Sequence, residues 1–174
     1  KVAKAQGMKT IVGAWIGADL EENEKEIKGL IKLAEAGLVD IAAVGNEVLL
    51  REDLTKEKLL GYIQQVKKAM PNISVGCVDT YYQFHENADL VAACDVILAN
   101  CYPFWEGSSV DKASHYLQQM HAITQKAANG KPVIITETGW PNRGNHTHNA
   151  VPSDENAMKY FINVNNWRQK HEVE

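Results

Sequence analysis

Residues 41–47 read Ile-Ala-Ala-Val-Gly-Asn-Glu, a short apolar run that ends directly in a glutamate. Residues 133–137 repeat the arrangement as Val-Ile-Ile-Thr-Glu. Runs that are apolar on nearly every residue are typical of strands buried on both faces of a parallel sheet. A carboxylate at the end of such a strand is poorly solvated, and burying it without a partner is costly. Glu47 and Glu137 are therefore either tied to an arginine or to backbone amides, or placed there for chemistry.

Three further apolar segments complete a set of five predicted strands. Amphipathic stretches with helical period separate them, so strand and helix alternate about every 25 to 35 residues, as in βαβ units. No glycine-rich phosphate loop follows any of them, which makes a nucleotide-binding sheet the weaker interpretation. The pattern favours an α/β fold: an incomplete (β/α)8 TIM barrel of about five parallel strands with intervening helices. The predicted strands are Lys9–Ile16, Val39–Val44, Ile73–Val78, Val96–Asn100 and Pro132–Thr136.

The helical stretches carry start and stop signals. The second long helix is predicted to begin after Thr55, a good N-cap residue, and to end at Pro71. The last is predicted to begin behind Ser153, and a shorter helix is predicted over Glu86–Ala93.

Length and composition bound the class of protein. The chain has 174 residues, of which 45% are hydrophobic, and a formal net charge of −4. This length favours a single domain over two, so we expect residues 1–174 to form one domain, a fragment of such a barrel. The chain has no clustered basic face and no apolar run of the roughly 20 residues that span a bilayer, so neither nucleic acid nor a membrane span is expected. The three cysteines lack metal-site spacing and are expected to be buried thiols.

Polar and aromatic residues gather where the predicted strands end, which is where α/β barrels place their active sites. Glu47 and Glu137 are about 90 residues apart, or three βα units of a barrel, so they can face each other across its mouth. Glycoside hydrolysis uses two carboxyl groups that flank a cleft. One is protonated and donates its proton to the leaving oxygen, and the other is ionised and attacks the sugar. The nearby side chains that offer flat apolar faces to sugar rings are Trp140, Tyr102, Phe104 and Trp105.

Three segments, in this order and at barrel spacing, resemble the signatures of glycoside hydrolase family 17. They are Val44-Gly45-Asn46-Glu47-Val48, Asn100-Cys101-Tyr102-Pro103-Phe104 and Ile135-Thr136-Glu137-Thr138-Gly139-Trp140-Pro141. That family contains endo-β-1,3-glucanases, lichenases and glucan transglycosylases on a (β/α)8 barrel. The resemblance implies a retaining hydrolase that cleaves laminarin-type β-1,3-glucan by double displacement, and this mechanism needs no metal or organic cofactor.

The resemblance also implies roles for single residues. Glu47 would be the acid/base and Glu137 the nucleophile. Asn46 would hydrogen-bond the sugar 2-hydroxyl, and Tyr102 would contact the nucleophile and hold its orientation. The residues that would form part of the sugar platform, unless they only pack at the barrel rim, are Trp140 and Phe104.

The chain departs from the family in strand number, since the five predicted strands match only the third to the seventh of eight. Open edges at Lys9–Ile16 and Pro132–Thr136 would leave backbone groups unpaired, so self-association is expected. By resemblance the protein is secreted, periplasmic or on the cell surface. No signal peptide is recognised in this chain, because Lys1–Gln6 is interpreted as the end of a helix.

Three other interpretations stand beside hydrolysis. A covalent glycosyl-enzyme can pass its sugar to another sugar instead of water, which makes a β-glucan transglycosylase the alternative within the family. A non-catalytic glucan-binding barrel fragment is the alternative outside enzymes, although a pure binder has no reason to keep both glutamates. His146 and His148 could suggest a metal site, but their loop lacks a carboxylate or cysteine, which favours a solvated loop.

Overall fold

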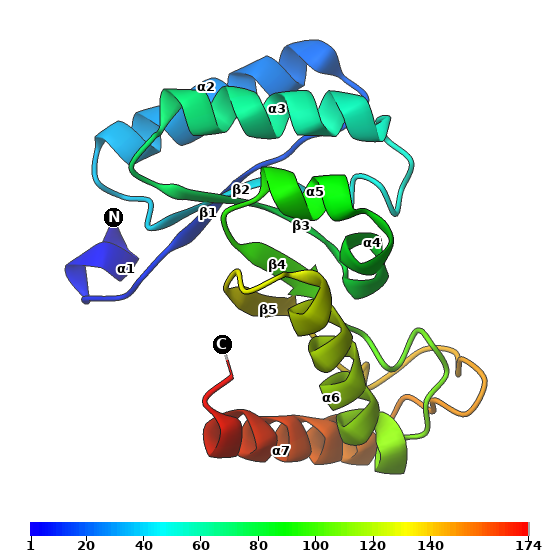
Figure 1. The fold of residues 1–174 in the computed structure, drawn as a ribbon. Coiled ribbons are helices and arrows are strands. Elements are labelled where there is room, and N and C mark those ends of the chain that lie inside the picture. Colours follow the sequence, from blue (N-terminus) through cyan, green and yellow to red (C-terminus); the bar gives the residue numbers. More distant parts are fainter. Residues whose placement is uncertain (174) are drawn as a thin grey trace.

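The computed structural model describes residues 1–173 and contains a five-stranded sheet in which every neighbouring pair is parallel. The strands lie in the order β1-β2-β3-β4-β5, so each pairs with the next strand along the chain. The sheet is an open arc with β1 and β5 at its edges, which confirms the predicted fold. The strands are β1 Ile11–Ala14, β2 Ile41–Asn46, β3 Ser74–Thr80, β4 Ile97–Asn100 and β5 Val133–Glu137 (Figure 1).

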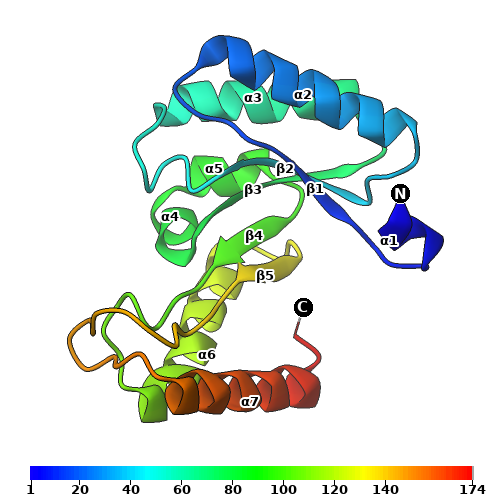
Figure 2. The same ribbon diagram turned by 180° about the vertical axis from the view of Figure 1, so that it is seen from behind.

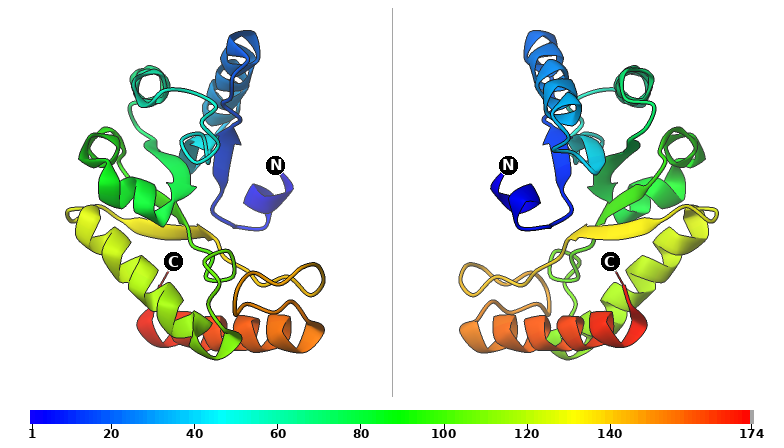
Figure 3. Two further views of the ribbon diagram at one scale, coloured as in Figure 1. Left: turned by 90° about the vertical axis from the view of Figure 1, so that its right-hand side faces the viewer. Right: turned by 90° about the vertical axis from the view of Figure 1, so that its left-hand side faces the viewer.

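Apart from the short helix next to the N-terminus, which lies at the start of β1, the helices lie on the outer side of this curved sheet, as the views in Figure 2 and Figure 3 show. No helix within residues 1–173 is long and apolar enough to cross a bilayer. The helices are α1 Val2–Ala5, α2 Leu20–Glu35, α3 Lys56–Ala69, α4 Tyr81–Glu86, α5 Ala88–Ala93, α6 Val110–Ala127 and α7 Asp154–His171.

Burial follows the alternation of side chains along the strands. On the outer face, Ala42, Val75 and Ile97 join the main core beneath the helices. On the inner face, a smaller cluster consists of Ala43, Val78, Val96 and Leu98. The central strands are thus buried on both faces, as their composition predicts, whereas the edge strand β5 is only half-buried along its length.

The helix caps predicted at Thr55 and Ser153 are confirmed. Thr55 Oγ1 accepts a hydrogen bond from the Lys58 backbone N–H at 3.5 Å, and Ser153 Oγ accepts one from that of Asn156 at 3.0 Å. Each oxygen satisfies a backbone donor that the first turn of a helix leaves free.

The predicted helix over Glu86–Ala93 has the wrong bounds. Two short helices, α4 and α5, meet instead at Asn87, whose backbone is not helical (φ −123°, ψ 84°). The Asn87 side-chain amide donates to the carbonyl oxygen of Gln83 at 2.9 Å. A side chain that bonds the preceding turn offers the backbone an alternative to the helix, which explains the break.

The three cysteines are free and buried, as predicted. Burial raises the pKa of Cys94 to about 11 and that of Cys101 to about 12. These thiols are therefore packing groups rather than nucleophiles at neutral pH.

Gly76 lies in β3 at a point where no side chain fits. A Cβ atom there would lie 2.6 Å from the Val96 carbonyl oxygen and 3.0 Å from Leu98 Cγ. Because that oxygen is backbone, the Gly76→Ala change must separate β3 from β4, and it should lower the free energy of unfolding by about 1–3 kcal/mol. Gly61→Ala is the matched control: Gly61 lies in α3 with nothing within 4 Å of the added atom, and the change should stabilise by about 0.5–1 kcal/mol. Urea denaturation measures both, and equal stabilities would contradict this packing.

Candidate active site

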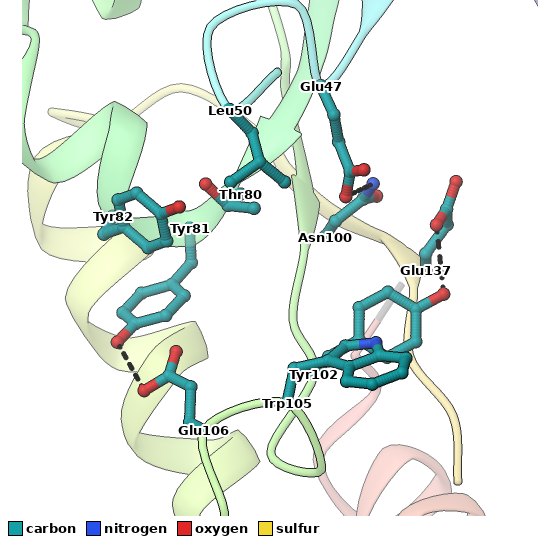
Figure 4. A pocket seen from close by; sticks show the side chains of 10 residues that line it. All are labelled: Glu47, Leu50, Thr80, Tyr81, Tyr82, Asn100, Tyr102, Trp105, Glu106 and Glu137. Carbon is teal, nitrogen blue, oxygen red and sulfur yellow. Dashed lines mark hydrogen bonds between the residues drawn. The ribbon is translucent and has the colours of Figure 1, made fainter. Parts of the chain in front are cut away.

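The carboxyl ends of β2, β3, β4 and β5 meet around one cleft of about 540 Å³. In Figure 4, Glu47 and Glu137 lie on one side of this cleft with Asn100 between them, and Tyr81 and Glu106 lie across from them. The structure thus brings the two predicted catalytic residues into the same cleft. The lining residues are Glu47, Leu50, Thr80, Tyr81, Tyr82, Asn100, Tyr102, Trp105, Glu106 and Glu137.

An extra residue in β2 turns the end of this strand toward the inner face. Ala43 pairs with Gly76, but the next pair joins Asn46 to Val78, so β2 has one residue more than β3 between these points. Val78 belongs to the inner cluster, and register partners in a parallel pair share a face. Simple alternation after Ala42 and Val44 would point Asn46 outward. The bulge places Asn46 on the inner side instead.

Left-handed backbone conformations complete this turn. Gly45 has φ 76° and Glu47 has φ 53°. A Cβ atom at Gly45 would lie 2.5 Å from Val48 Cγ2, so glycine is required there for space as well as for its dihedral angle. Glu47 is not a glycine and is strained, and its backbone N–H is held by the Val78 carbonyl oxygen at 2.8 Å.

A second bulge directs Glu137. Ala99 pairs with Ile135 on the outer face, but Asn100 pairs with Glu137, so β5 carries one residue more than β4. Ile134 packs against the inner cluster, and strict alternation would therefore point Glu137 outward, toward the helices. The bulge turns Glu137 into the cleft instead.

Asn100 links the two glutamate-bearing strands. It is 1% exposed, and its side-chain amide donates to Glu47 Oε1 at 2.9 Å and to Asn46 Oδ1 at 3.4 Å. Its own Oδ1 accepts a hydrogen bond from Thr136 Oγ1 at 2.8 Å. No role was predicted for Asn100 from the sequence, although its position at the end of a buried strand is a signal for one. The sugar contact predicted for Asn46 stays a prediction.

Tyr102 holds the other carboxylate. Its hydroxyl donates to Glu137 Oε2 at 3.0 Å, in agreement with the contact implied for this residue. Burial, assisted by the hydrogen bond to Glu137, raises the pKa of Tyr102 to about 12. The phenol therefore remains a donor throughout the range in which a carboxylate titrates.

A third carboxylate occupies the opposite wall of the cleft. Glu106 Oε2 accepts hydrogen bonds from the hydroxyls of Tyr116, on α6, and Tyr81, the latter at 3.4 Å. Trp105, next to it in the chain, lines the same cleft and is 65% exposed. The cleft therefore contains an anchored third carboxyl group as well as an open aromatic face.

The aromatic residues proposed for sugar binding do not all reach the cleft. Phe104 is 1% exposed and packs edge-on against Trp105 and Trp140, with ring centroids 5.0 and 5.1 Å apart. This burial contradicts a sugar contact for Phe104, which instead supports the two indoles. Trp140 faces a separate hollow of about 420 Å³ beside α7, and its Nε1 donates to the Val151 carbonyl oxygen. A sugar-binding role of Trp140 stays a prediction.

The loop that carries His146 and His148 makes a packing contact. A Cβ atom at Gly107 would lie 2.7 Å from that of His148, so the loop rests closely on the segment after β4. His146 is exposed. Within residues 1–173, no group of three or more His, Cys, Asp or Glu side chains could hold a metal ion.

The BtgE/BtgC glycoside hydrolase domain family matches residues 1–173. The chain belongs to this family. A glucan 1,3-β-glucosidase of Arthroderma benhamiae is 31% identical to it over 173 residues, which cover 91% of this chain and 56% of that protein. A glucan 1,3-β-glucosidase of Candida albicans is 32% identical over 176 residues, which cover 89% and 57% of the two chains.

Solved structures agree with this assignment. This glycoside hydrolase domain superposes with a TM-score of 0.87 on the glycoside hydrolase family 17 β-1,3-glucanosyltransferase of Rhizomucor miehei, at 34% identity over 98% of this chain and 65% of that chain. An active-site mutant of that enzyme, solved with laminaritriose, gives the same TM-score at 33% identity. The predicted kinship to family 17 is confirmed. The domain spans between about half and two thirds of these relatives, so its five strands correspond to part of their barrel.

The contact between Tyr102 and Glu137 can be tested by titration. Replacing the carboxylate by an amide in Glu137→Gln removes the charge that opposes ionisation of Tyr102, so the pKa of Tyr102 should fall from about 12 toward its ordinary value of about 10. NMR titration of ¹³C-labelled tyrosine measures it, with the Tyr102 signal assigned by its absence in Tyr102→Phe. An unchanged titration in Glu137→Gln would leave burial as the sole cause of the shift.

Proposed function

We propose that this domain carries the catalytic pair of a retaining glycoside hydrolase that cleaves β-1,3-glucan of the laminarin type. The observation that carries the proposal is that Glu47 and Glu137 reach one cleft from strands three apart, each with one oxygen held by a neutral donor. The names of the fungal relatives and the laminaritriose bound to the Rhizomucor enzyme support a β-1,3-glucan as substrate.

The first step of the proposed mechanism uses the two carboxyl groups together. Tyr102 holds Glu137 Oε2, which leaves Oε1 to attack the anomeric carbon of the sugar. As that C–O bond forms, the bond from the anomeric carbon to the departing sugar breaks, and the departing oxygen takes the proton of Glu47. Asn100 holds Glu47 Oε1, so Oε2 is the oxygen that carries this proton.

The second step returns both groups to their starting states. Glu47, now ionised, accepts a proton from water while the water oxygen attacks the anomeric carbon. The bond to Glu137 breaks and its carboxylate is released, with the sugar configuration retained after two inversions. Every proton in the cycle moves between Glu47 and an oxygen, so neither a metal nor an organic cofactor is needed.

Transglycosylation is the second candidate, in which a sugar hydroxyl replaces water in the second step. The name of the Rhizomucor glucanosyltransferase favours it. The cleft also suits an acceptor sugar, since Tyr82 and the exposed Trp105 line it and offer flat apolar faces. A polymeric glucan cannot enter a cell, and we accordingly propose a secreted, periplasmic or cell-surface location.

Mutation of the two glutamates should have different effects. Glu137→Ala should lower the rate by about 10⁴-fold or more, because no nucleophile remains, and azide should restore turnover with an inverted glycosyl azide. Glu47→Ala should lower cleavage of glucan by about 10²–10⁴-fold but spare the initial burst of aryl release from activated aryl glucosides, whose leaving groups need no acid. Reducing-sugar and aryl-release assays measure both, with the exposed Glu35→Ala as a control that keeps full activity.

The same assays separate the alternatives. Reversed behaviour of the two variants would mean that the acid and the nucleophile are exchanged. Retention of the wild-type protein on insoluble glucan without release of reducing ends would identify a binding module. Products longer than the starting laminari-oligosaccharide, resolved by chromatography, would identify transfer in place of hydrolysis.

We also propose that the chain associates with a second copy along β5. The backbone N–H of Trp15, at the end of the other edge strand, is capped by Glu26 Oε2 at 2.9 Å, whereas β5 is half-buried throughout, and the segment that follows it shares a hollow with the exposed Phe161 of α7. Unpaired strand edges favour pairing with another chain. Sedimentation should show a concentration-dependent dimer, weakened at least about tenfold by Phe161→Lys and unchanged by Gln169→Lys on the same helix. A monomer at all concentrations would contradict the proposal.

A further inference from the structure

We propose that Asp79 is a positioning residue for Glu47, acting through the backbone of the turn that follows β2. The proposal rests on the proposed function, because it assigns to Glu47 the role of proton donor. It adds a residue that neither the sequence motifs nor the lining of the cleft indicates, since Asp79 lies beneath the cleft at the end of β3.

Asp79 is unusual in its burial. Its side chain is 0% exposed, and among residues 1–173 no other carboxylate is buried. The other buried polar side chains in this range are those of Asn23, Asn100, His121 and Thr124. No lysine, arginine or histidine in that range forms an ion pair with it. Burial, and to a smaller extent the nearby Glu47 carboxylate, raise the pKa of Asp79, and the backbone N–H groups of Thr80, Leu49 and Leu50 oppose this shift. Burying a carboxylate without a cationic partner is costly, so its hydrogen bonds are expected to hold another part of the structure in position.

The two bonds of Asp79 both go to backbone N–H groups. Oδ1 accepts from Thr80 at 2.8 Å, within its own strand end. Oδ2 accepts from Leu49 at 3.0 Å, across to the turn that follows β2. Only the second bond reaches another element, so it is the one through which Asp79 acts on the site.

The turn holds Glu47 in a strained conformation between two anchors on β3. Glu47 itself has φ 53°, and such strain persists only where neighbouring contacts fix it. On one side of its side chain, the Glu47 N–H donates to the Val78 carbonyl oxygen at 2.8 Å. On the other side, two residues further, the Leu49 N–H donates to Asp79. Val78 and Asp79 are consecutive, so the end of β3 clamps the turn on both sides of Glu47.

An amide in place of this carboxylate removes one bond without changing the volume. The Asp79→Asn side chain has a single acceptor oxygen and an NH₂ group, while Leu49 and Thr80 both present donors. The variant must therefore place its NH₂ group against one of these N–H groups and break that hydrogen bond. We expect the turn to be released, because the bond to Thr80 is local and easier to keep.

Two substrates with different leaving groups distinguish a displaced Glu47 from a general loss of structure in the variant. Cleavage of a laminari-oligosaccharide needs a proton from Glu47, whereas 2,4-dinitrophenolate leaves without one. Asp79→Asn should lower the first rate by about 100-fold, as a displacement of about 1 Å can do. The initial burst of dinitrophenolate from a 2,4-dinitrophenyl β-glucoside should change less than about threefold. Azide should then accelerate steady turnover, because the second step also depends on Glu47.

Asp95→Asn is the matched control. Asp95 also accepts a backbone N–H of β3, that of Val75 at 3.1 Å, but at the opposite end of the sheet and with Lys67 as a partner. Both rates should stay within about twofold of wild type in this variant. A wild-type protein that cleaves neither substrate would refute the proposed function and not the role of Asp79. An equal loss of both rates in Asp79→Asn, or no loss of either, would overturn that role.

A second measurement needs no variant. If Asp79 holds the turn, the Leu49 amide should exchange its hydrogen at least about 100-fold more slowly than an unstructured amide, as followed by NMR of the folded wild-type protein. Free exchange at Leu49 in the folded protein would overturn the proposal even where Asp79→Asn does not fold.

Discussion

Side chains alternate between the two faces of a strand, and in this sheet that alternation alone would point Asn46 and Glu137 toward the helices. There they would enter an apolar core where a carboxylate is strongly disfavoured. One additional residue in β2 and one in β5 change the face on which these side chains emerge. Contacts of the site depend on this shift, since Asn100 reaches Asn46 and Tyr102 reaches Glu137 only once both strand ends turn inward.

The partners of the two glutamates are neutral. Within residues 1–173 no lysine, arginine or histidine forms an ion pair with Glu47 or Glu137; an amide holds the first and a phenol holds the second. A cation in either place would favour the ionised form of the carboxyl group over the protonated one. Amide and hydroxyl donors fix the geometry while biasing protonation far less. That suits the role proposed for Glu47, in which the group gives up a proton and takes it back within each cycle.

The sequence was sufficient for the order and direction of the strands and for the two glutamates, because these follow from local apolar runs and from what ends them. It was insufficient where the answer depends on neighbouring strands. A bulge exists only relative to a partner, so neither the inward turn at Asn46 nor the one at Glu137 could be read from β2 or β5 alone. Adjacent aromatic residues pose the same problem: Phe104 and Trp105 were both predicted to offer faces to sugar rings, and of the two only Trp105 lines the cleft.

The strands follow one another in space in the order of the chain, and this has a consequence for biosynthesis. Within this sheet each strand pairs with the one made just before it, so β2 to β5 can each be added on the ribosome without waiting for a distant segment. Glu47, at the end of β2, emerges well before Glu137, which arrives with β5. A nascent chain therefore completes the proposed proton donor first, and the cleft cannot hold the proposed catalytic pair until β5 has been made.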